Sequence, residues 1–155
     1  NPDTSALRYG KICILADADS DGLHIATLLC ALFLQHYKPL VQEGRIYVSM
    51  PPLFRIDCAK EVFYALDDSQ RDTIVKELKA KKGKPKINIQ RFKGLGEMNP
   101  SQLRETVMDP ASRQLVSLTI SPNDNANSVM DLLLAKKRAP DRKEWLEKKG
   151  SLAKV

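Results

Sequence analysis

Three aspartates at alternate positions are the side chains of this sequence best suited to chemistry. Asp17, Asp19 and Asp21 occur at every second position and are followed directly by Gly22. Carboxylates this close together repel one another and raise one another's pKa values unless a cation lies among them. Carboxylate oxygens with room for water are the ligands that Mg²⁺ prefers. We therefore interpret this acidic turn, residues 17–22, as a magnesium site, with a solvated turn that caps a helix as the simpler alternative.

A strand and a helix must hold the acidic turn in place. The run from Lys11 to Ala16 is short and apolar, which predicts a buried parallel strand. Beyond the turn, apolar residues at helical spacing predict a helix from about Leu23 to Pro39. Residues 45–50 predict a second strand, and the whole is a βαβ unit with a right-handed crossover. Ligands of such sheets bind at the carboxyl ends of the strands, which is where the acidic turn lies.

Two other carboxylate motifs begin in a similar way. An EF-hand calcium loop starting at Asp17 would need Glu at the position of Leu28, and a helix instead of a strand in front of it. Phosphatases of the haloacid dehalogenase class use Asp-x-Asp after a strand, with Thr or Val at the position that Asp21 occupies here. A third carboxylate suits metal binding better than attack on phosphorus, so such a phosphatase is kept only as an alternative.

Alternation and capping signals predict the other elements. The clearest helix start is Asn99-Pro100-Ser101-Gln102, with an N-cap, a proline at the first helical position and a glutamine at the third. The further expected elements are a hairpin near residues 54–56 and 62–64, a helix starting at Ser69 with Asp72, strands at 87–92 and 116–120, a helix at about 126–137, and a helix after Asp141 with Glu144 as its capping partner.

Charge is segregated along the 155-residue chain. Residues 1–70 carry 6 Lys and Arg against 9 Asp and Glu, whereas residues 71–155 carry 19 against 10. The stretch from Arg71 to Lys93 alone holds 9 against 2. An acidic part suits a divalent cation, and a basic part suits a polyanion such as DNA. A solvated helix face is the alternative interpretation of the basic stretch.

Composition argues against several classes of protein. Cys13, Cys30 and Cys58 are odd in number and widely spaced, which argues against a disulfide framework or a zinc site and favours a reducing compartment. No apolar run approaches the ~20 residues of a membrane helix. The chain begins at Asn1 without a signal peptide, so we expect a segment of a longer cytoplasmic chain.

Two long motifs resemble those of bacterial type IIA topoisomerase B subunits nearly residue for residue. They are ICILADADSDGLHIATLL and QRFKGLGEMNPSQLRETVMDP, which are similar to the TOPRIM region and the adjoining carboxyl-terminal segment. The resemblance extends from about Tyr9 to Gly150, and the late segment LLLAKKRAPDRKEWLEKKG looks more like topoisomerase IV than gyrase. It implies an α/β fold with a TOPRIM-like parallel sheet flanked by helices. Residues 1–86 would be the carboxyl-terminal part of the TOPRIM metal-binding domain, and residues 87–155 a smaller α+β carboxyl-terminal segment.

The resemblance also implies roles for individual residues. Asp17 and Asp19 match the family's magnesium-binding aspartates, and Asp21 matches a third acid of lesser weight. His24 and Arg142 match positions that resemble DNA contacts in the family, with a helix residue without a function as the alternative for each. Lys93 matches the lysine of the family's KGLGE turn and is also predicted to bind DNA. Lys93 opens a glycine-rich turn, residues 93–97, whose amides and lysine suit phosphate, although a packing turn is the alternative.

The family's activity needs groups that this sequence does not contain. By resemblance, the general acid/base is a glutamate in an upstream Glu-Gly-Asp-Ser sequence, ATP binds to another domain of the whole B subunit, and the nucleophilic tyrosine belongs to the partner A subunit. None of the chain's own tyrosines is therefore assigned as the nucleophile. The whole enzyme is expected to be a heterotetramer that cleaves and reseals both DNA strands with Mg²⁺. We expect the 155-residue chain alone to be inactive. A fragment of a gyrase B subunit is the alternative.

Overall fold

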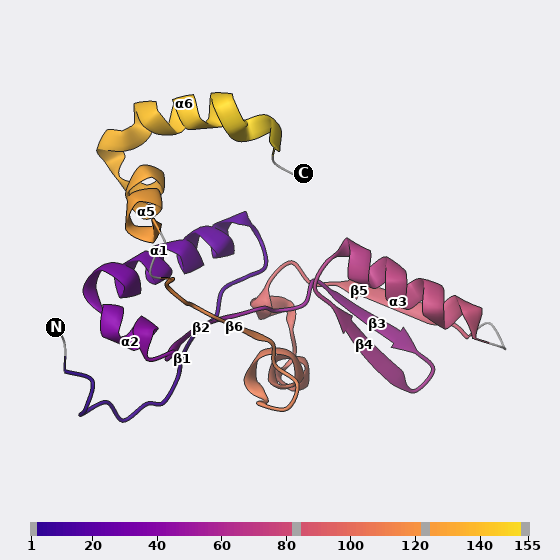
Figure 1. The fold of residues 1–155 in the computed structure, drawn as a ribbon. Helices are drawn as coiled ribbons and strands as arrows, with labels where there is room; N and C mark the ends of the chain where they lie inside the picture. Colours follow the sequence, from indigo (N-terminus) through magenta and orange to yellow (C-terminus); the bar gives the residue numbers. More distant parts are fainter. Residues whose placement is uncertain (1–2, 82–84, 122–124, 153–155) are drawn as a thin grey trace.

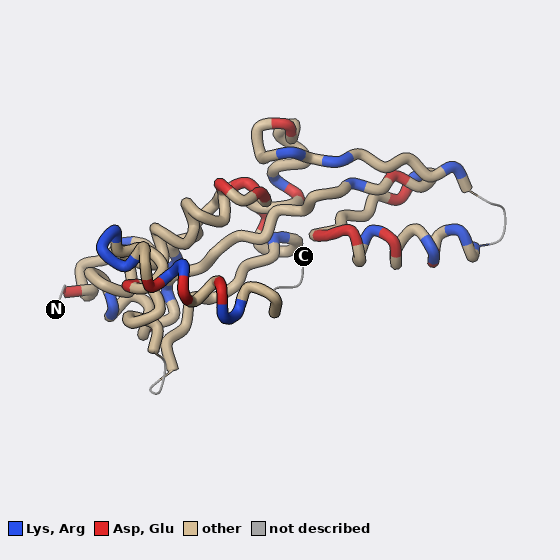
Figure 2. The backbone as a smooth tube through the Cα atoms, turned by 90° about the horizontal axis from the view of Figure 1, so that it is seen from above, with Lys and Arg blue, Asp and Glu red and all other residues tan. Residues whose placement is uncertain are grey.

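The computed structural model describes residues 3–81, 85–121 and 125–152. It is a mixed α/β structure, as the sequence predicts, and its two three-stranded sheets follow one another along the molecule (Figures 1 and 2). The strands of the first sheet have the order β1-β2-β6, and those of the second have the order β4-β3-β5. The acidic turn follows β1 of the first sheet, and the glycine-rich turn follows β5 of the second.

The first sheet contains the predicted βαβ unit. β1 and β2 are parallel, with Ile14 paired to Val48, and β6 runs antiparallel on the other side of β2. The helix after β1 starts ahead of the predicted Leu23, because the carboxylate of Asp19 caps it by accepting a hydrogen bond from the Gly22 amide at 2.7 Å. The elements are β1 (Ile12–Ile14), α1 (Ser20–His36), α2 (Lys38–Gln42), β2 (Ile46–Ser49) and β6 (Leu115–Ser117).

The core of the first sheet lies between its strands and the two helices. The buried side chains that form it are Ile14, Ala26, Cys30, Leu34, Leu40, Val41 and Ile46. Burial raises the pKa of the Cys30 thiol, so this cysteine stays protonated and acts as a small apolar side chain. Cys13 and Cys58 are free thiols as well, and Cys58 is buried in the core of the second sheet.

The second sheet contains the predicted hairpin. β3 and β4 pair with Phe54 opposite Ala65, and β5 lies antiparallel on the other side of β3. α3 covers one face of this sheet, and its Leu78 packs into a core with Phe54 and Ile56. The elements are β3 (Phe54–Cys58), β4 (Glu61–Ala65), α3 (Asp68–Ala80) and β5 (Ile87–Arg91).

The start of α3 differs from the prediction. The helix begins at Asp68 instead of Ser69, and its N-cap is Asp67, whose carboxylate accepts a hydrogen bond from the Gln70 amide at 2.8 Å. Gln70 in turn accepts a hydrogen bond from the Leu66 amide at 3.0 Å. Several residues here are good N-caps by type, so the pattern alone did not select the one that is used.

The segment after β5 returns from the second sheet to the first. Phe92 is 1% exposed, and its amide donates to the carbonyl oxygen of Leu53 at 2.8 Å. The predicted cap at Asn99 is confirmed, because the side chains of Asn99 and Gln102 accept from each other's backbone amides. The elements of this segment are η1 (Leu95–Glu97), α4 (Pro100–Leu103) and the π-helical turn η2 (Arg104–Met108).

Strand pairing crosses the predicted boundary between residues 86 and 87. β5 pairs with β3 and β6 pairs with β2, so each sheet combines strands from both sides of this boundary. The division into residues 1–86 and 87–155 stays a prediction about sequence segments.

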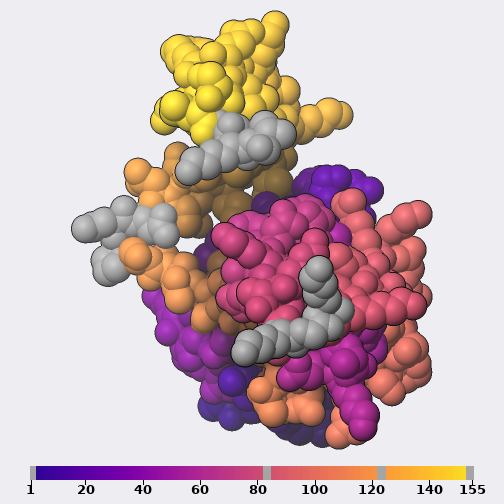
Figure 3. All heavy atoms as spheres, turned by 90° about the vertical axis from the view of Figure 1, so that its right-hand side faces the viewer, coloured from indigo at the N-terminus to yellow at the C-terminus, as the bar shows by residue number. Residues whose placement is uncertain are grey.

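Two helices close the described part of the chain. α5 contacts α1, and α6 lies outside the body of the molecule beyond α5 (Figures 1 and 3). α6 begins at Ala139, ahead of the predicted Asp141, with Pro140 in its first turn. The expected capping partner Glu144 forms an ion pair with Lys148 instead. The elements are α5 (Ala126–Leu134), η3 (Lys136–Arg138), α6 (Ala139–Lys149) and η4 (Gly150–Leu152). Among the described helices, none combines the length and the apolar character needed to cross a membrane.

Candidate functional site

The acidic turn lies at the carboxyl end of β1, where parallel sheets place their ligands. Asp17, Asp19 and Asp21 are all exposed to solvent. Asp21 belongs to the first turn of α1. Backbone amides at a helix N-terminus stabilise negative charge, so this end of α1 offsets part of the repulsion among the carboxylates.

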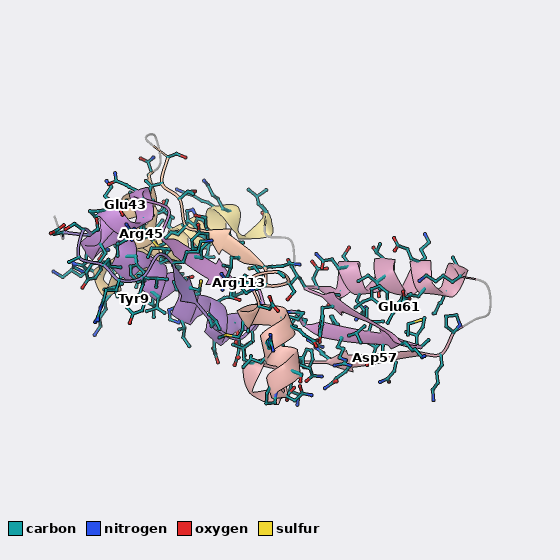
Figure 4. The ribbon with its side chains drawn as sticks, turned by 90° about the horizontal axis from the view of Figure 1, so that it is seen from below. Tyr9, Glu43, Arg45, Asp57, Glu61 and Arg113 are labelled. Atoms are coloured by element: carbon teal, nitrogen blue, oxygen red, sulfur yellow. The ribbon has the colours of Figure 1, made fainter. Side chains whose placement is uncertain are left out.

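The chain leading into β1 is held by the start of β2. Arg45 donates from Nε to Glu43 at 2.6 Å and from Nη1 to the carbonyl oxygen of Tyr9 at 3.2 Å, and the three residues lie together in Figure 4. The Thr4 hydroxyl donates to the other carboxylate oxygen of Glu43 at 2.6 Å, and this bond holds the pKa of Glu43 below its usual value. These contacts fix the path of the strand that carries the acidic turn.

Asp19 has a structural role beside the predicted one. Its Oδ1 accepts the hydrogen bond from the Gly22 amide that caps α1. The helix-capping alternative is therefore correct for this residue. The bond uses one carboxylate oxygen and leaves the other for a second partner.

Asp17 contacts the glycine-rich turn, in which Leu95 lies 78 positions further along the chain. The Leu95 amide donates a hydrogen bond to Asp17 Oδ1 at 2.8 Å. Gly94 lies against the same carboxylate, since a Cβ atom on Gly94 would be 2.7 Å from Asp17 Oδ2. Ala18 and Pro52 line one small hollow together with these two turn residues. The structure thus brings together two motifs that the sequence presents far apart.

Most amides of the glycine-rich turn already have partners inside the protein. The Lys93 amide donates to Glu97 Oε2 at 2.8 Å. The amides of Glu97 and Met98 donate to the carbonyl oxygens of Gly94 and Leu95 at 3.2 and 3.1 Å. Together with the Leu95 amide, four amides of residues 93–98 thus have acceptors within the protein, which favours the packing-turn alternative for them. The Lys93 side chain is exposed, and its contact with phosphate stays a prediction.

The three predicted DNA contacts lie in different surroundings. His24 and Lys93 are exposed, and Lys93 lies beside the acidic turn because it precedes Gly94. Arg142 is half-buried on α6, where its Nη1 donates to the carbonyl oxygens of Leu132 and Ala135 at 3.1 and 2.7 Å. Arg142 therefore ties α6 to the end of α5. Contact of all three with DNA stays a prediction.

The carboxylates of the acidic turn have the right chemistry for magnesium but do not complete a site by themselves. Within residues 3–81, 85–121 and 125–152, no three Asp, Glu, His or Cys side chains are grouped so that they could hold a metal ion. Asp17 and Asp19 each have one oxygen bound to a backbone amide and one left over. Exposed carboxylate oxygens suit Mg²⁺, which keeps several of its waters. Magnesium binding by Asp17 and Asp19 stays a prediction.

The basic stretch from Arg71 to Lys93 is interrupted by acidic partners. Arg71 forms an ion pair with Asp72 at 2.7 Å, and Lys81 forms one with Glu61 at 3.1 Å. Basic and acidic positions alternate along α3 in Figure 2. Surface pairs of this kind contribute little to stability, but they reduce the positive field that a polyanion would meet.

Sequence reasoning missed the partner of Tyr64. The Tyr64 hydroxyl donates to Glu105 Oε2 at 2.9 Å and so links β4 to η2. Burial, together with the Glu105 carboxylate, raises the pKa of Tyr64 to about 12. That Tyr64 is not the attacking tyrosine stays a prediction. No local pattern in the sequence connects the two residues.

Comparisons with known proteins bear on the predicted resemblance. Residues 84–147 match the protein family described as DNA gyrase B subunit, carboxyl terminus. The chain is 63% identical, over 99% of its length, to the B subunit of DNA topoisomerase 4 from Pseudomonas aeruginosa, and 61% identical, over 99%, to the Escherichia coli protein of that name. It is 43% identical over 94% of its length to the B subunit of DNA gyrase from Thermotoga maritima. The chain spans about a quarter of the length of these relatives.

These matches point to one kind of relative. The chain is similar over nearly its whole length to the B subunits of DNA topoisomerase 4 and of DNA gyrase. Within this class, its identity to the B subunits of DNA topoisomerase 4 is 61–66%, which exceeds its identity of 38–43% to those of DNA gyrase. The predicted resemblance to topoisomerase IV is therefore confirmed, and the phosphatase alternative gains no support.

Proposed function

We propose that this chain is the metal-binding and DNA-binding part of an ATP-dependent type IIA DNA topoisomerase, equivalent to part of the topoisomerase IV B subunit. The observation that carries the proposal is the meeting of the acidic turn with the glycine-rich turn through Asp17 and Leu95. The exposed carboxylates and the exposed Lys93 thus belong to two turns that are in contact with each other. The identity to the B subunits of DNA topoisomerase 4 supports the same proposal.

In the proposed mechanism, Asp17 and Asp19 would hold Mg²⁺, and Asp21 would add negative charge beside them. When bound, the magnesium ion supplies positive charge at the scissile phosphodiester. Lys93 and His24 bind the DNA backbone and hold it over the acidic turn. A tyrosine of the partner A subunit attacks the phosphodiester, and reversal of the same transesterification reseals the strand. ATP is bound elsewhere in the whole B subunit.

Charge removal at Asp17 tests the proposal. The full-length B subunit is reconstituted with its partner A subunit, and magnesium-dependent cleavage of supercoiled DNA is measured for the native protein and for Asp17→Asn. We expect the variant to lose cleavage while it stays folded, since Asn can still accept the Leu95 hydrogen bond.

The matched control is Asp72→Asn on α3. Asp72 is exposed and its ion pair with Arg71 lies on the surface, so this variant loses the same charge away from the acidic turn. It should cleave DNA like the native protein. Near-normal cleavage by Asp17→Asn, or hydrolysis of a small phosphate ester by the chain alone, would contradict the proposed function.

A further inference from the structure

Two glycines that lie far apart in the sequence lie against Asp17. A Cβ atom on Gly22 would overlap the backbone oxygen of Asp17. A Cβ atom on Gly94 would be 2.7, 2.8 and 2.9 Å from Oδ2, Cγ and Oδ1 of the same residue. Real Cβ atoms essentially never approach other heavy atoms within 3.0 Å. The space for Asp17 therefore exists because both positions lack a side chain.

Backbone conformation does not explain the glycine at position 94. Its φ of −166° and ψ of 175° are extended values that any residue adopts. The neighbouring Gly96 belongs to the same turn, yet a Cβ atom there would meet nothing within 4 Å. Of these two positions, only position 94 requires glycine, because the carboxylate of Asp17 occupies the space that a side chain there would need.

The turn also holds the carboxylate by a directed bond. The Leu95 amide donates to Asp17 Oδ1 at 2.8 Å, and the Glu97 carboxylate braces the turn by accepting from the Lys93 amide at 2.8 Å. A carboxylate fixed through one oxygen presents the other in a defined direction. Partners of this kind behind a metal ligand typically change metal affinity or activity by about 10- to 100-fold when they are removed.

We propose that the glycine-rich turn is a positioning element for the Asp17 carboxylate. Leu95 fixes one carboxylate oxygen through its amide, and Gly94 provides the space that the carboxylate fills. The Asp17 side chain is then held in one rotamer before a cation binds, and its second oxygen is available to the cation. This inference rests on the proposed magnesium role of Asp17 and gives the glycine-rich turn a task that does not involve phosphate.

The magnesium dependence of DNA cleavage should differ between a variant at Gly94 and a variant at Gly96. In the full-length B subunit, reconstituted with its partner A subunit, Gly94→Ala forces the Asp17 side chain away from Leu95. We expect the magnesium concentration for half-maximal DNA cleavage to rise about 10-fold, with a smaller loss of cleavage at saturating magnesium. Gly96→Ala adds the same methyl group to the same turn and should leave the magnesium dependence unchanged. Equal magnesium dependence in the two variants would overturn the proposal.

Hydrogen–deuterium exchange measures the contact without any activity. In the metal-free full-length B subunit, Gly94→Ala and Asp17→Ala should both speed exchange in the peptide spanning residues 93–98, because the Leu95 amide loses its acceptor. Asp17→Asn and Gly96→Ala should exchange like the native protein. Unchanged exchange in Asp17→Ala would show that the turn does not depend on this carboxylate, against the proposal.

The two sets of results distinguish the inference from the proposed function. If Asp17→Asn keeps full cleavage, the magnesium assignment is wrong, and the positioning proposal falls with it even where exchange reports the contact. If Asp17→Asn abolishes cleavage but Gly94→Ala matches Gly96→Ala in magnesium dependence and exchange, the positioning proposal alone is wrong.

Discussion

Single carboxylates at the acidic turn have two tasks each. Asp17 and Asp19 each accept a backbone amide hydrogen bond with one oxygen, at 2.8 and 2.7 Å. In the proposed function, the other oxygen of each would bind a cation. Asparagine preserves the first task and removes the charge that the second requires, whereas alanine removes both. Paired Asn and Ala variants therefore separate local structure from metal binding at each position.

Asp19 provides a direct test of this separation. Asp19→Ala removes the N-cap of α1 and should lower the free energy of unfolding by about 1 kcal/mol, whereas Asp19→Asn should be close to native, since Asn caps as well as Asp. Urea unfolding of the full-length B subunit measures the difference. Both variants should lose magnesium-dependent cleavage. Equal stability of the Ala and Asn variants would show that the cap contributes nothing.

Tyr64 gives a prediction for alkaline pH. Its folded pKa of about 12 lies above the ordinary value of 10.0, so its contribution to stability is complete below pH 10 and is lost as the pH rises through 12. Tyr64→Phe removes the bond to Glu105 and should lower the free energy of unfolding by about 1 kcal/mol at neutral pH. That difference should shrink between pH 10 and 12.

Tyrosinate absorbance supplies an independent measurement. If Tyr64 ionises near pH 12, the difference in absorbance between the native protein and Tyr64→Phe should develop near pH 12. A difference that is already complete near pH 10 would mean that Tyr64 ionises normally.

At the scale of elements, strong periodicity made β1, α1 and β2 predictable. The acidic turn could be placed because its position after a buried strand is local information. Helix starts were less certain, because neighbouring polar residues compete as caps, and the cap at Asp67 was missed for this reason. The contact between Asp17 and Leu95 could not be predicted from residue types, since no periodic pattern spans such a separation.

The helix α3 carries a prediction about DNA. The basic residues around its end are Lys79, Lys81, Lys82 and Lys84, of which Lys82 and Lys84 lie outside the described residues. If this run lies along DNA, changing all four to Gln should reduce the slope of log affinity against log salt by about 0.9 for each phosphate contact that is removed. Sequence preference should not change. Filter binding at several salt concentrations measures the slope, and an unchanged slope would show a solvated face.

At the scale of the whole molecule, we expect the candidate site to need groups that this sequence does not contain. Within the described residues, no three metal-binding side chains are grouped so that they could hold a metal ion, and the chain spans about a quarter of the length of its relatives. The resemblance places the missing glutamate upstream and the attacking tyrosine on the A subunit. We therefore expect activity to be a property of the assembly. This chain would contribute the carboxylates of the acidic turn, the glycine-rich turn that contacts them, and basic side chains.

Two lengths of the B subunit test whether activity requires groups outside this chain. The 155-residue chain should fold, bind magnesium weakly, in the ~mM range, and fail to cleave supercoiled DNA when mixed with the A subunit. A longer version that includes the upstream Glu-Gly-Asp-Ser sequence should regain magnesium-dependent cleavage with the same partner. Efficient cleavage by the shorter chain would mean that the upstream glutamate is dispensable.

The bond from Leu95 to Asp17 joins the turn after a strand of one sheet to the segment that leaves the other. A cation at Asp17 withdraws electron density from the carboxylate that accepts this bond, so cation binding and the attachment of the two sheets share one group. Thermodynamic linkage then requires each to change the other by the same factor. Tension that draws the two sheets apart would then alter cation occupancy at Asp17. Cation binding would in turn change the force that is needed to separate the two sheets.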